Sequence, residues 1–149
     1  MNMKIKNLSE VNEEDFKKFK TIEWKKADDE HYGDKPPNFT VLEHTFVAEE
    51  AGEIIGQIEL KIDQGVAKIE SLLVGSLHQG KGIGGDLVMA SESWALANGA
   101  HKISLETGSE WSARKFYEKL GYEIRAVLPN DVAHQDFVLM DKMLEDGDF

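Results

Sequence analysis

The stretch from Val74 to Gly85, VGSLHQGKGIGG, is the most informative part of this 149-residue sequence. It follows a segment that predicts a buried strand, Val66–Val74, and it runs into an amphipathic helix that begins at Ile83. Glycines in such a loop let the backbone approach a ligand closely, and the N–H groups at a helix N-terminus attract anions. The stretch therefore predicts a pyrophosphate-binding loop, and its letters fit three kinds of cofactor site.

Two of these three kinds of site are disfavoured by their context. Gly75–Lys81 spells most of a nucleotide P-loop, but Gly82 follows where that motif requires a Ser or Thr hydroxyl to hold magnesium. Gly80, Gly82 and Gly85 spell the dinucleotide fingerprint G-x-G-x-x-G, and Glu106 stands about twenty residues on, where a ribose-binding acid belongs. That fold places its fingerprint after the first strand, whereas several predicted strands come before this loop. Both readings remain as weaker alternatives.

Outside the loop, the apolar pattern predicts a mixed α+β sheet flanked by helices, in one domain that spans residues 1–149. The predicted strands are Met3–Leu8, Thr45–Ala48, Ile54–Ile62, Val66–Val74, His101–Gly108, Glu123–Val127 and Asp136–Met143. One helix follows an N-cap at Asn12. Two more helices carry core-facing stripes, formed by Ile83, Leu87, Ala90, Trp94 and Ala97 and by Ala113, Phe116 and Leu120. The predicted order is β-α-β-β-β-α-β-α-β-β.

Three local features add to this outline. Strict alternation in the strand Ile54–Ile62 puts Ile54 on the same face as Ile58, Leu60 and Ile62. The charged segment from Lys25 to Phe39 contains a Pro-Pro pair and predicts a mobile loop. The acidic C-terminal residues EDGDF predict a frayed tail.

Composition and charge exclude several classes of function. The formal net charge of −11 argues against a nucleic-acid partner, because binding to a phosphate backbone needs clustered Lys and Arg. The same charge favours cationic ligands, although it also serves solubility alone. The sequence contains no cysteine, which excludes disulfides, thiolate metal sites and a cysteine nucleophile. No apolar run approaches membrane-spanning length, so we expect no membrane partner and a cytoplasmic location.

A second motif, Ser112–Glu123 (SARKFYEKLGYE), decides among the three readings. Together with the glycine loop it closely resembles the GNAT superfamily of acetyl-CoA-dependent N-acetyltransferases. The family loop V-x-P-x-x-R/Q-G-x-G-I/V-G/A and its later stretch A-x-x-F/L-Y-x-K-x-G-F/Y are matched by Val74, Gln79, Gly80, Gly82, Ile83, Gly84, Ala113, Phe116, Tyr117, Lys119, Gly121 and Tyr122. Ser76 departs from the family's Pro. Glu110 stands where many members carry a pantetheine-binding Asn, so we do not transfer that contact.

The resemblance implies acetyl-CoA as cosubstrate, no metal, and direct attack of an amine on the thioester within a ternary complex. The residues implied to hold the cofactor are those of the strand end, the glycine loop and the second motif: Leu72, Leu73, Val74, Gln79, Gly80, Lys81, Gly82, Ile83, Gly84, Gly85, Ala113 and Tyr117. Tyr117 matches the family's general acid, which protonates the departing thiolate. On spacing alone Tyr117 also fits a core aromatic.

The base that deprotonates the amine is less well marked. Our candidate is Glu70, because alternation puts this acid on the same face as Leu72 and Val74 in an apolar strand. A salt-bridged or edge-exposed glutamate fits equally well, and Glu59, His44, His78 and Glu106 are weaker alternatives. The sequence leaves the acceptor open between a cationic small molecule and a lysine or N-terminal amine, and it does not decide whether a homodimer forms. A non-catalytic acyl-CoA-binding or sensing module is the alternative function.

Overall fold

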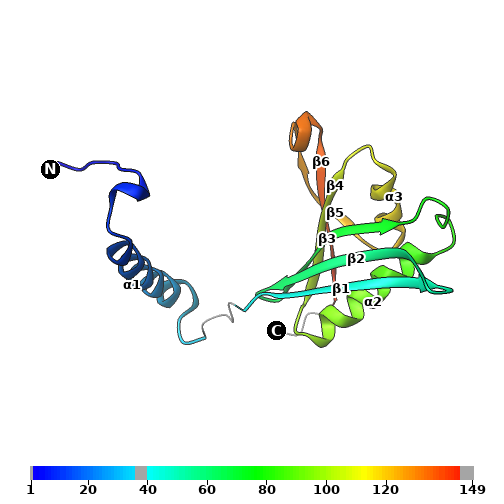
Figure 1. The fold of residues 1–149 in the computed structure, drawn as a ribbon, viewed down its shortest axis with the longest axis horizontal. Helices are drawn as coiled ribbons and strands as arrows, with labels where there is room; N and C mark the ends of the chain where they lie inside the picture. Colours follow the sequence, from blue (N-terminus) through cyan, green and yellow to red (C-terminus); the bar gives the residue numbers. More distant parts are fainter. Residues whose placement is uncertain (1, 36–39, 145–149) are drawn as a thin grey trace. The chain divides into compact units, whose positions relative to one another are not determined.

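A computed structural model describes residues 2–35 and 40–144 of the chain. The chain divides into two compact units, Met1–Asn38 and Phe39–Phe149, which are described separately below (Figure 1). In the part of the chain that the structure describes, no helix is long and apolar enough to cross a membrane.

The N-terminal unit consists of a short 3-10 helix, η1 (Leu8–Glu10), and one long helix, α1 (Glu13–Tyr32). The predicted cap is confirmed, because the side chain of Asn12 accepts a hydrogen bond from the N–H of Asp15 at 3.0 Å. The predicted opening strand is wrong, since residues 2–7 form no strand. The described N-terminal unit contains no strand with which this short segment could form a ladder.

The prediction of a loop from Lys25 onward is also wrong over its first part. Helix α1 continues to Tyr32, and Gly33 follows at a φ of +61°. Lys25 and Asp29 form an ion pair of 2.8 Å one turn apart, so charge here supports the helix instead of ending it. The Pro-Pro pair of this predicted loop and the predicted frayed tail lie outside the described residues.

The second unit is a six-stranded sheet with two helices, so the predicted mixed α+β class is confirmed. Its elements are β1 (Leu42–Glu50), β2 (Glu53–Asp63), β3 (Val66–Val74), α2 (Ile83–Ala97), β4 (Lys102–Gly108), α3 (Ser112–Lys119), β5 (Glu123–Leu128), the 3-10 helix η2 (Val132–His134) and β6 (Phe137–Met143). The strand order is β1-β2-β3-β4-β6-β5. Only the central pair β3–β4 is parallel, and the other pairs are antiparallel.

A β-bulge changes the predicted faces at the start of β2. Gly56 pairs with Ala48 of β1, but Ile54 pairs with Glu49, so Ile55 is an extra residue in the ladder. The extra residue reverses the alternation. Ile54 is therefore 65% exposed and does not share the buried face of Ile58, as we had predicted, while Ile55 is buried.

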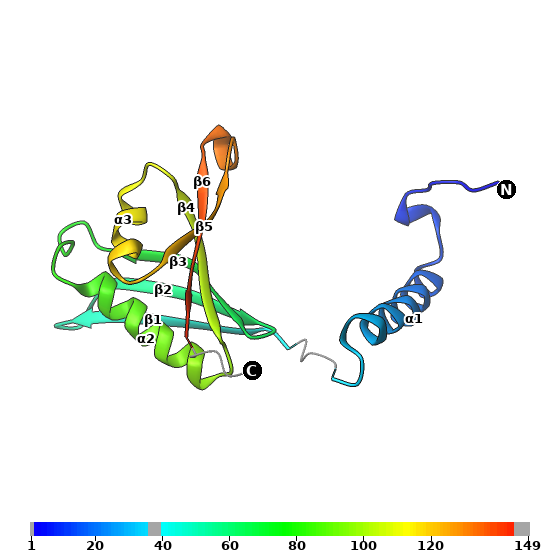
Figure 2. The same ribbon diagram turned by 180° about the vertical axis from the view of Figure 1, so that it is seen from behind.

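One core holds the two helices against the sheet. Helix α2 packs on β1, β2 and β3, and α3 packs on β4 (Figure 2). The buried face of α2 consists of Leu87, Val88, Ser91 and Ala95. This face is rotated relative to the predicted stripe, so that Ala97 is exposed. The buried face of α2 belongs to the same core cluster as the buried isoleucines of β2, Ile58 and Ile62.

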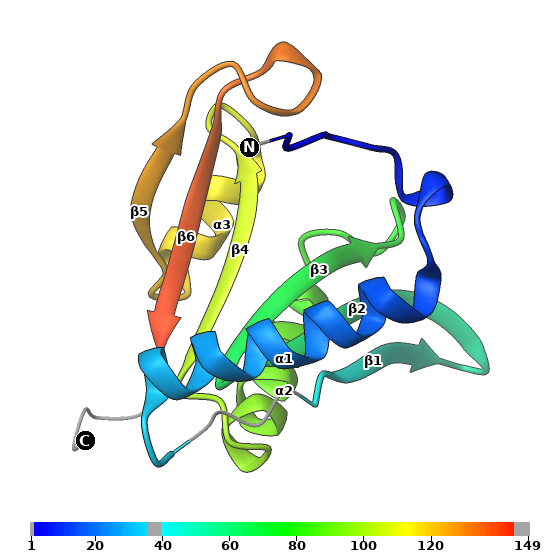
Figure 3. The same cartoon turned by 90° about the vertical axis from the view of Figure 1, so that its left-hand side faces the viewer.

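The two central strands diverge soon after they begin. The pairing of β3 with β4 is limited to the first three residues of each strand, from Val66 opposite Lys102 to Lys68 opposite Ser104. Beyond this point β3 and β4 no longer pair with each other, and Figure 3 shows the two strands separating. The backbone edge of β3 from residue 69 to 74 thus lacks a neighbouring strand on the β4 side. An open strand edge of this kind can pair with an extended ligand.

Candidate active site

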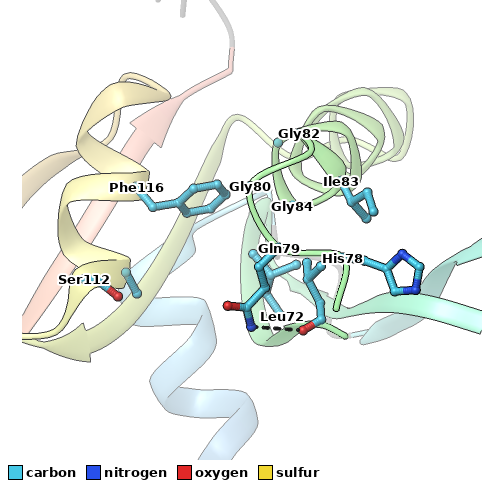
Figure 4. A pocket seen from close by; sticks show the side chains of 12 residues that line it. Leu72, His78, Gln79, Gly80, Gly82, Ile83, Gly84, Ser112 and Phe116 are labelled. Carbon is cyan, nitrogen blue, oxygen red and sulfur yellow. Dashed lines mark hydrogen bonds between the residues drawn. The ribbon is translucent and has the colours of Figure 1, made fainter. Parts of the chain in front are cut away.

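A pocket of about 590 Å³ lies at the end of the diverging strands (Figure 4), and it is called the large pocket below. Its walls come from the end of β3, the glycine loop with the first turn of α2, and the first turns of α3. The lining residues are Leu72, Val74, His78, Gln79, Gly80, Gly82, Ile83, Gly84, Gly85, Ser112, Ala113 and Phe116. The fold thus brings together the two sequence motifs that lie about thirty residues apart, as βα connections commonly do at the carboxyl ends of strands.

The glycine loop is shaped by two left-handed residues. Gly80 and Gly82 have φ angles of +79° and +84°, which cost little for glycine and strain other residues. Gly82 is the N-cap of α2 and supplies no side-chain acceptor to the first turn. The N–H groups of that turn are therefore left for a ligand. The side chain of Gln79 ties the loop down by donating to the carbonyl of Val74 at 3.3 Å.

Phe116 forms the wall opposite the glycine loop. Its ring packs against Gly84, where a Cβ would stand 3.2 Å from Cζ of the ring. The sequence predicts Phe116 as a core residue and as part of the second motif but not as a cofactor contact, and the residue does pack on the core as well. His78 and Ser112 are the other lining residues that the predicted cofactor set omitted. Their one sequence signal was their place inside the two motifs.

Three residues of the predicted cofactor set do not line the pocket. Leu73 is 65% exposed, because alternation turns its side chain away from that of Leu72. Lys81 is exposed on the loop. Tyr117 is 5% exposed and belongs to the buried cluster beneath α3.

Tyr117 lies in an aromatic environment. Its ring makes edge contacts with Phe116 and Tyr122, at centroid distances of 4.9 and 5.4 Å. Within the described part of the chain, its hydroxyl has no hydrogen-bond partner. Burial raises the pKa of Tyr117 to about 12. The phenol is therefore protonated at neutral pH and can donate a hydrogen bond.

The hydroxyl of Tyr122, by contrast, is hydrogen-bonded. Its hydroxyl donates to Glu92 of α2 at 3.0 Å, and the same carboxylate accepts from the ammonium of Lys142 at 3.1 Å. Lys142 also donates to the carbonyl of Leu120, which closes the end of α3. Burial, and then the charge of Glu92, raise the pKa of Tyr122. This cluster holds α2, α3 and β6 together.

The position of Glu70 corrects the prediction that it shares a face with Leu72 and Val74. Glu59 pairs with Ser71, but Leu60 pairs with Ile69, so Glu70 is the extra residue of a bulge in β3. The bulge lets Glu70 leave the apolar face. Its carboxylate instead forms a 3.1 Å ion pair with Lys61, and both side chains are about 40% exposed.

The alternative bases occupy different surroundings. The ring of His44 stacks on Trp94 of α2, with centroids 4.8 Å apart and an interplanar angle of 15°. Glu59 and Glu106 are exposed on their strands. His78 is the one alternative that lines the large pocket, and its Nδ1 is buried without a hydrogen-bond partner in the described chain.

Solved structures share this fold. An acetyltransferase from Bacillus cereus ATCC 14579 is similar with a TM-score of 0.71 and 22% identity, over 95% of this chain and 97% of that one. An aminoglycoside 6'-N-acetyltransferase complexed with coenzyme A is similar with a TM-score of 0.64 and 24% identity, over 70% of this chain and 74% of that one.

Two curated proteins are similar in sequence to parts of this chain. The uncharacterized protein YdhI of Bacillus subtilis (strain 168) is 40% identical over 84 residues, which are 56% of this chain and 51% of that protein. A streptothricin acetyltransferase of Escherichia coli is 32% identical over 77 residues, 50% of this chain and 44% of that protein. The chain thus spans about half the length of the curated relatives it matches. The model of the acetyltransferase (GNAT) family matches residues 6–122, and the chain belongs to this family.

Proposed function

We propose that this chain is an N-acetyltransferase of one domain, residues 1–149, which moves acetyl from acetyl-CoA to an amine without a metal. The observation that carries the proposal is the pocket between the open edge of β3 and the N-terminus of α2. Its glycine loop suits a pyrophosphate, and the open strand edge at Val74 suits the amide groups of a pantetheine arm. The loop side chains that contact the cofactor would be those of Gln79 and Ile83, with Ser112 and Phe116 opposite.

In the proposed reaction, the neutral amine nitrogen attacks the thioester carbonyl carbon, and the C–S bond breaks. The products are an amide and coenzyme A, and the proton lost by the amine ends on the sulfur. An ordinary amine has a pKa near 10.4, so forming its neutral species at pH 7 costs about 4–5 kcal/mol. A base near the acceptor lowers this cost, and we keep Glu70 as the candidate, acting directly or through water.

The role of Tyr117 follows from its burial. A phenol with a pKa of about 12 holds its proton firmly. Full transfer to a thiolate, whose thiol pKa is ~8.5, would cost about 5 kcal/mol, since each pKa unit is about 1.4 kcal/mol. We therefore propose that Tyr117 stabilises the departing sulfur by donating a hydrogen bond as charge develops there. The proton of the attacking amine is then available to complete the thiol.

The test has two stages. In the first, thermal stability is measured with acetyl-CoA, coenzyme A, NAD and ATP, because a ligand at about 100 times its dissociation constant stabilises by about 2.7 kcal/mol. Stabilisation by NAD or ATP but not by coenzyme A would contradict the proposal that acetyl-CoA is the cosubstrate. In the second, release of free thiol from acetyl-CoA is followed with a panel of amines.

The second stage separates the enzyme from the non-catalytic sensing module. A sensor would bind acetyl-CoA in the first stage and release no thiol with any amine in the second. The panel should begin with polycationic amines, because the similar proteins include a streptothricin acetyltransferase and an aminoglycoside 6'-N-acetyltransferase. Simple amines, a lysine peptide and a peptide with a free N-terminus complete it.

A further inference from the structure

A second, smaller pocket of about 330 Å³ lies next to Ser112, the residue with which α3 and the second motif begin. It is lined by Ser109, Glu110 and Trp111 of the loop between β4 and α3, and by His134, Gln135 and Asp136 of the loop between β5 and β6. These two loops lie at the same end of the sheet, at the top of Figures 1 and 3. The chain passes directly from this pocket into Ser112 and Ala113, which line the large pocket.

Trp111 forms a rigid wall of this second pocket. Its indole N–H donates to Oε1 of Gln135 at 3.1 Å, and its ring meets that of Phe137 edge-on at a centroid distance of 5.2 Å. The ring lies so close over Gly108 that a Cβ at that position would overlap it. Although it is held on these sides, Trp111 remains 49% exposed. An anchored and half-exposed indole is the best aromatic surface for a cation.

Two carboxylates of the pocket lack a positive partner. Glu110 forms no ion pair or hydrogen bond with any residue that the structure describes. The carboxylate of Asp136 accepts one hydrogen bond, from the backbone N–H of Asn130 at 2.8 Å, and no cation of the described chain is paired with it. By contrast, the buried Asp141 of the same sheet is paired with Arg125 at 2.8 Å. The pocket thus combines an indole surface with negative charge that the chain itself leaves unbalanced.

We propose that this second pocket binds an ammonium group of the acceptor, and that the acceptor is therefore a diamine or polyamine. The inference rests on the proposed N-acetyltransferase function and adds the substrate class to it. An amine must be neutral to attack the thioester, whereas the group held by Trp111, Glu110 and Asp136 must be a cation. One nitrogen cannot be both at once. The two sites therefore require two different amino groups of one molecule.

The first test compares two acceptors that differ only in the second amine, cadaverine and pentylamine. Thiol release is measured with the full chain and with its Trp111→Ala and Trp111→Phe variants. We expect kcat/KM for cadaverine to fall about fivefold or more in Trp111→Ala, with a smaller loss in Trp111→Phe. The value for pentylamine and the KM for acetyl-CoA should remain unchanged. An equal loss for both amines would assign Trp111 to loop structure and overturn the proposal.

The carboxylates are tested with a matched pair of charge-removing variants. Asp136→Asn should lower kcat/KM for cadaverine and leave that for pentylamine unchanged. The loss should shrink at high salt, because the carboxylate is exposed. Asp63→Asn removes another exposed carboxylate, at the last residue of β2, and should leave kcat/KM for cadaverine unchanged. Equal behaviour of the two variants would mean that only the overall charge matters, which contradicts a site.

A binding measurement keeps this inference separate from the proposed function. Cadaverine is titrated into the protein with coenzyme A present, and the indole N–H resonance of Trp111 is followed by NMR, assigned by its loss in Trp111→Phe. A saturable shift with cadaverine that pentylamine does not produce supports the pocket, even if no amine is acetylated and the enzymatic proposal fails. If the protein acetylates amines but cadaverine causes no such shift, the proposed ammonium site is wrong and the proposed N-acetyltransferase function stands.

Discussion

Gly84 and Phe116 pack tightly against each other, because a Cβ at position 84 would stand 3.2 Å from Cζ and 3.4 Å from Cε2 of the ring. The contact joins the first turn of α2 to α3, and both residues line the large pocket. The two motifs of the sequence are therefore in direct contact through these residues. The family's preference for a small residue at this position thus has a steric basis in this chain.

Gly84→Ala should destabilise the protein by about 1 kcal/mol, because the cost of overpacking exceeds the gain in helix propensity. Gly85→Ala is the matched control, since a Cβ at Gly85 meets nothing within 4 Å and alanine favours the helix. Urea unfolding without ligand measures both. Equal stability of the two variants would mean that the Phe116 ring moves aside freely. Because Phe116 also bounds the pocket, Gly84→Ala should weaken coenzyme A binding as well.

Tyr117→Phe should lower turnover by at least about tenfold while leaving coenzyme A binding unchanged, because the hydroxyl acts on charge that develops only as the C–S bond breaks. Tyr122→Phe removes the same atom from the neighbouring ring and serves as the control. We expect the control to lose stability, since Glu92 loses a hydrogen bond, and to keep most of its turnover. Single-turnover measurement of thiol release isolates the chemical step. An unchanged rate in Tyr117→Phe would exclude the role proposed for it.

Glu70→Gln should lower kcat/KM at neutral pH and remove an ionisation from the acidic side of its pH profile, if Glu70 deprotonates the amine. Lys61→Met provides the complementary change, because it releases Glu70 from the 3.1 Å ion pair but keeps the carboxylate. Activity should survive in Lys61→Met. If both variants lose activity equally and keep the wild-type pH profile, the ion pair of Glu70 and Lys61 has a structural role and the base is another group. His78, which lines the large pocket, would then be the next candidate to test.

The outcome for Glu70 shows where the sequence ceases to be informative. Alternation correctly identifies the buried residues of β2 that follow its bulge, Ile58, Leu60 and Ile62. A bulge adds one residue to one strand, and nothing in a single strand's sequence reveals it, because the register belongs to the pair of strands. The two side chains whose faces were wrongly predicted lie at the bulges, since Ile54 precedes the extra residue Ile55 and Glu70 is itself the extra residue.

The glycine loop was predicted more fully because its constraints are local. The residues that need a positive φ, Gly80 and Gly82, are glycines, and the helix begins immediately after them. For Phe116 the core contact was predicted and the pocket contact was not. An apolar stripe on a helix indicates a core, and it does not indicate that one edge of the stripe also borders a pocket. The second pocket was missed because its two loops meet only through the order of the strands, with β6 between β4 and β5.

The free energy of unfolding should fall as the pH rises above about 10. Tyr117 and Tyr122 have raised pKa values in the folded chain, so between the ordinary tyrosine pKa of ~10 and the folded value they ionise on unfolding. Their contribution is complete below pH ~10 and is lost through the interval up to the folded pKa, at about 1.4 kcal/mol per pH unit for each tyrosine. Urea unfolding at several alkaline pH values measures the slope, and Tyr122→Phe should make it shallower. A slope that this variant leaves unchanged would contradict the prediction.

Glu92→Gln separates the two causes that raise the pKa of Tyr122. Removing the charge of Glu92 should lower the phenolate midpoint of Tyr122, because a neighbouring carboxylate disfavours a second negative charge. The midpoint should still stay above the ordinary tyrosine value, since burial is the larger cause and does not depend on Glu92. Phenolate absorbance during an alkaline titration of folded protein measures this, with Tyr122→Phe to identify the signal. A midpoint that does not move in Glu92→Gln would mean that the 3.0 Å hydrogen bond between Tyr122 and Glu92 is not maintained in solution.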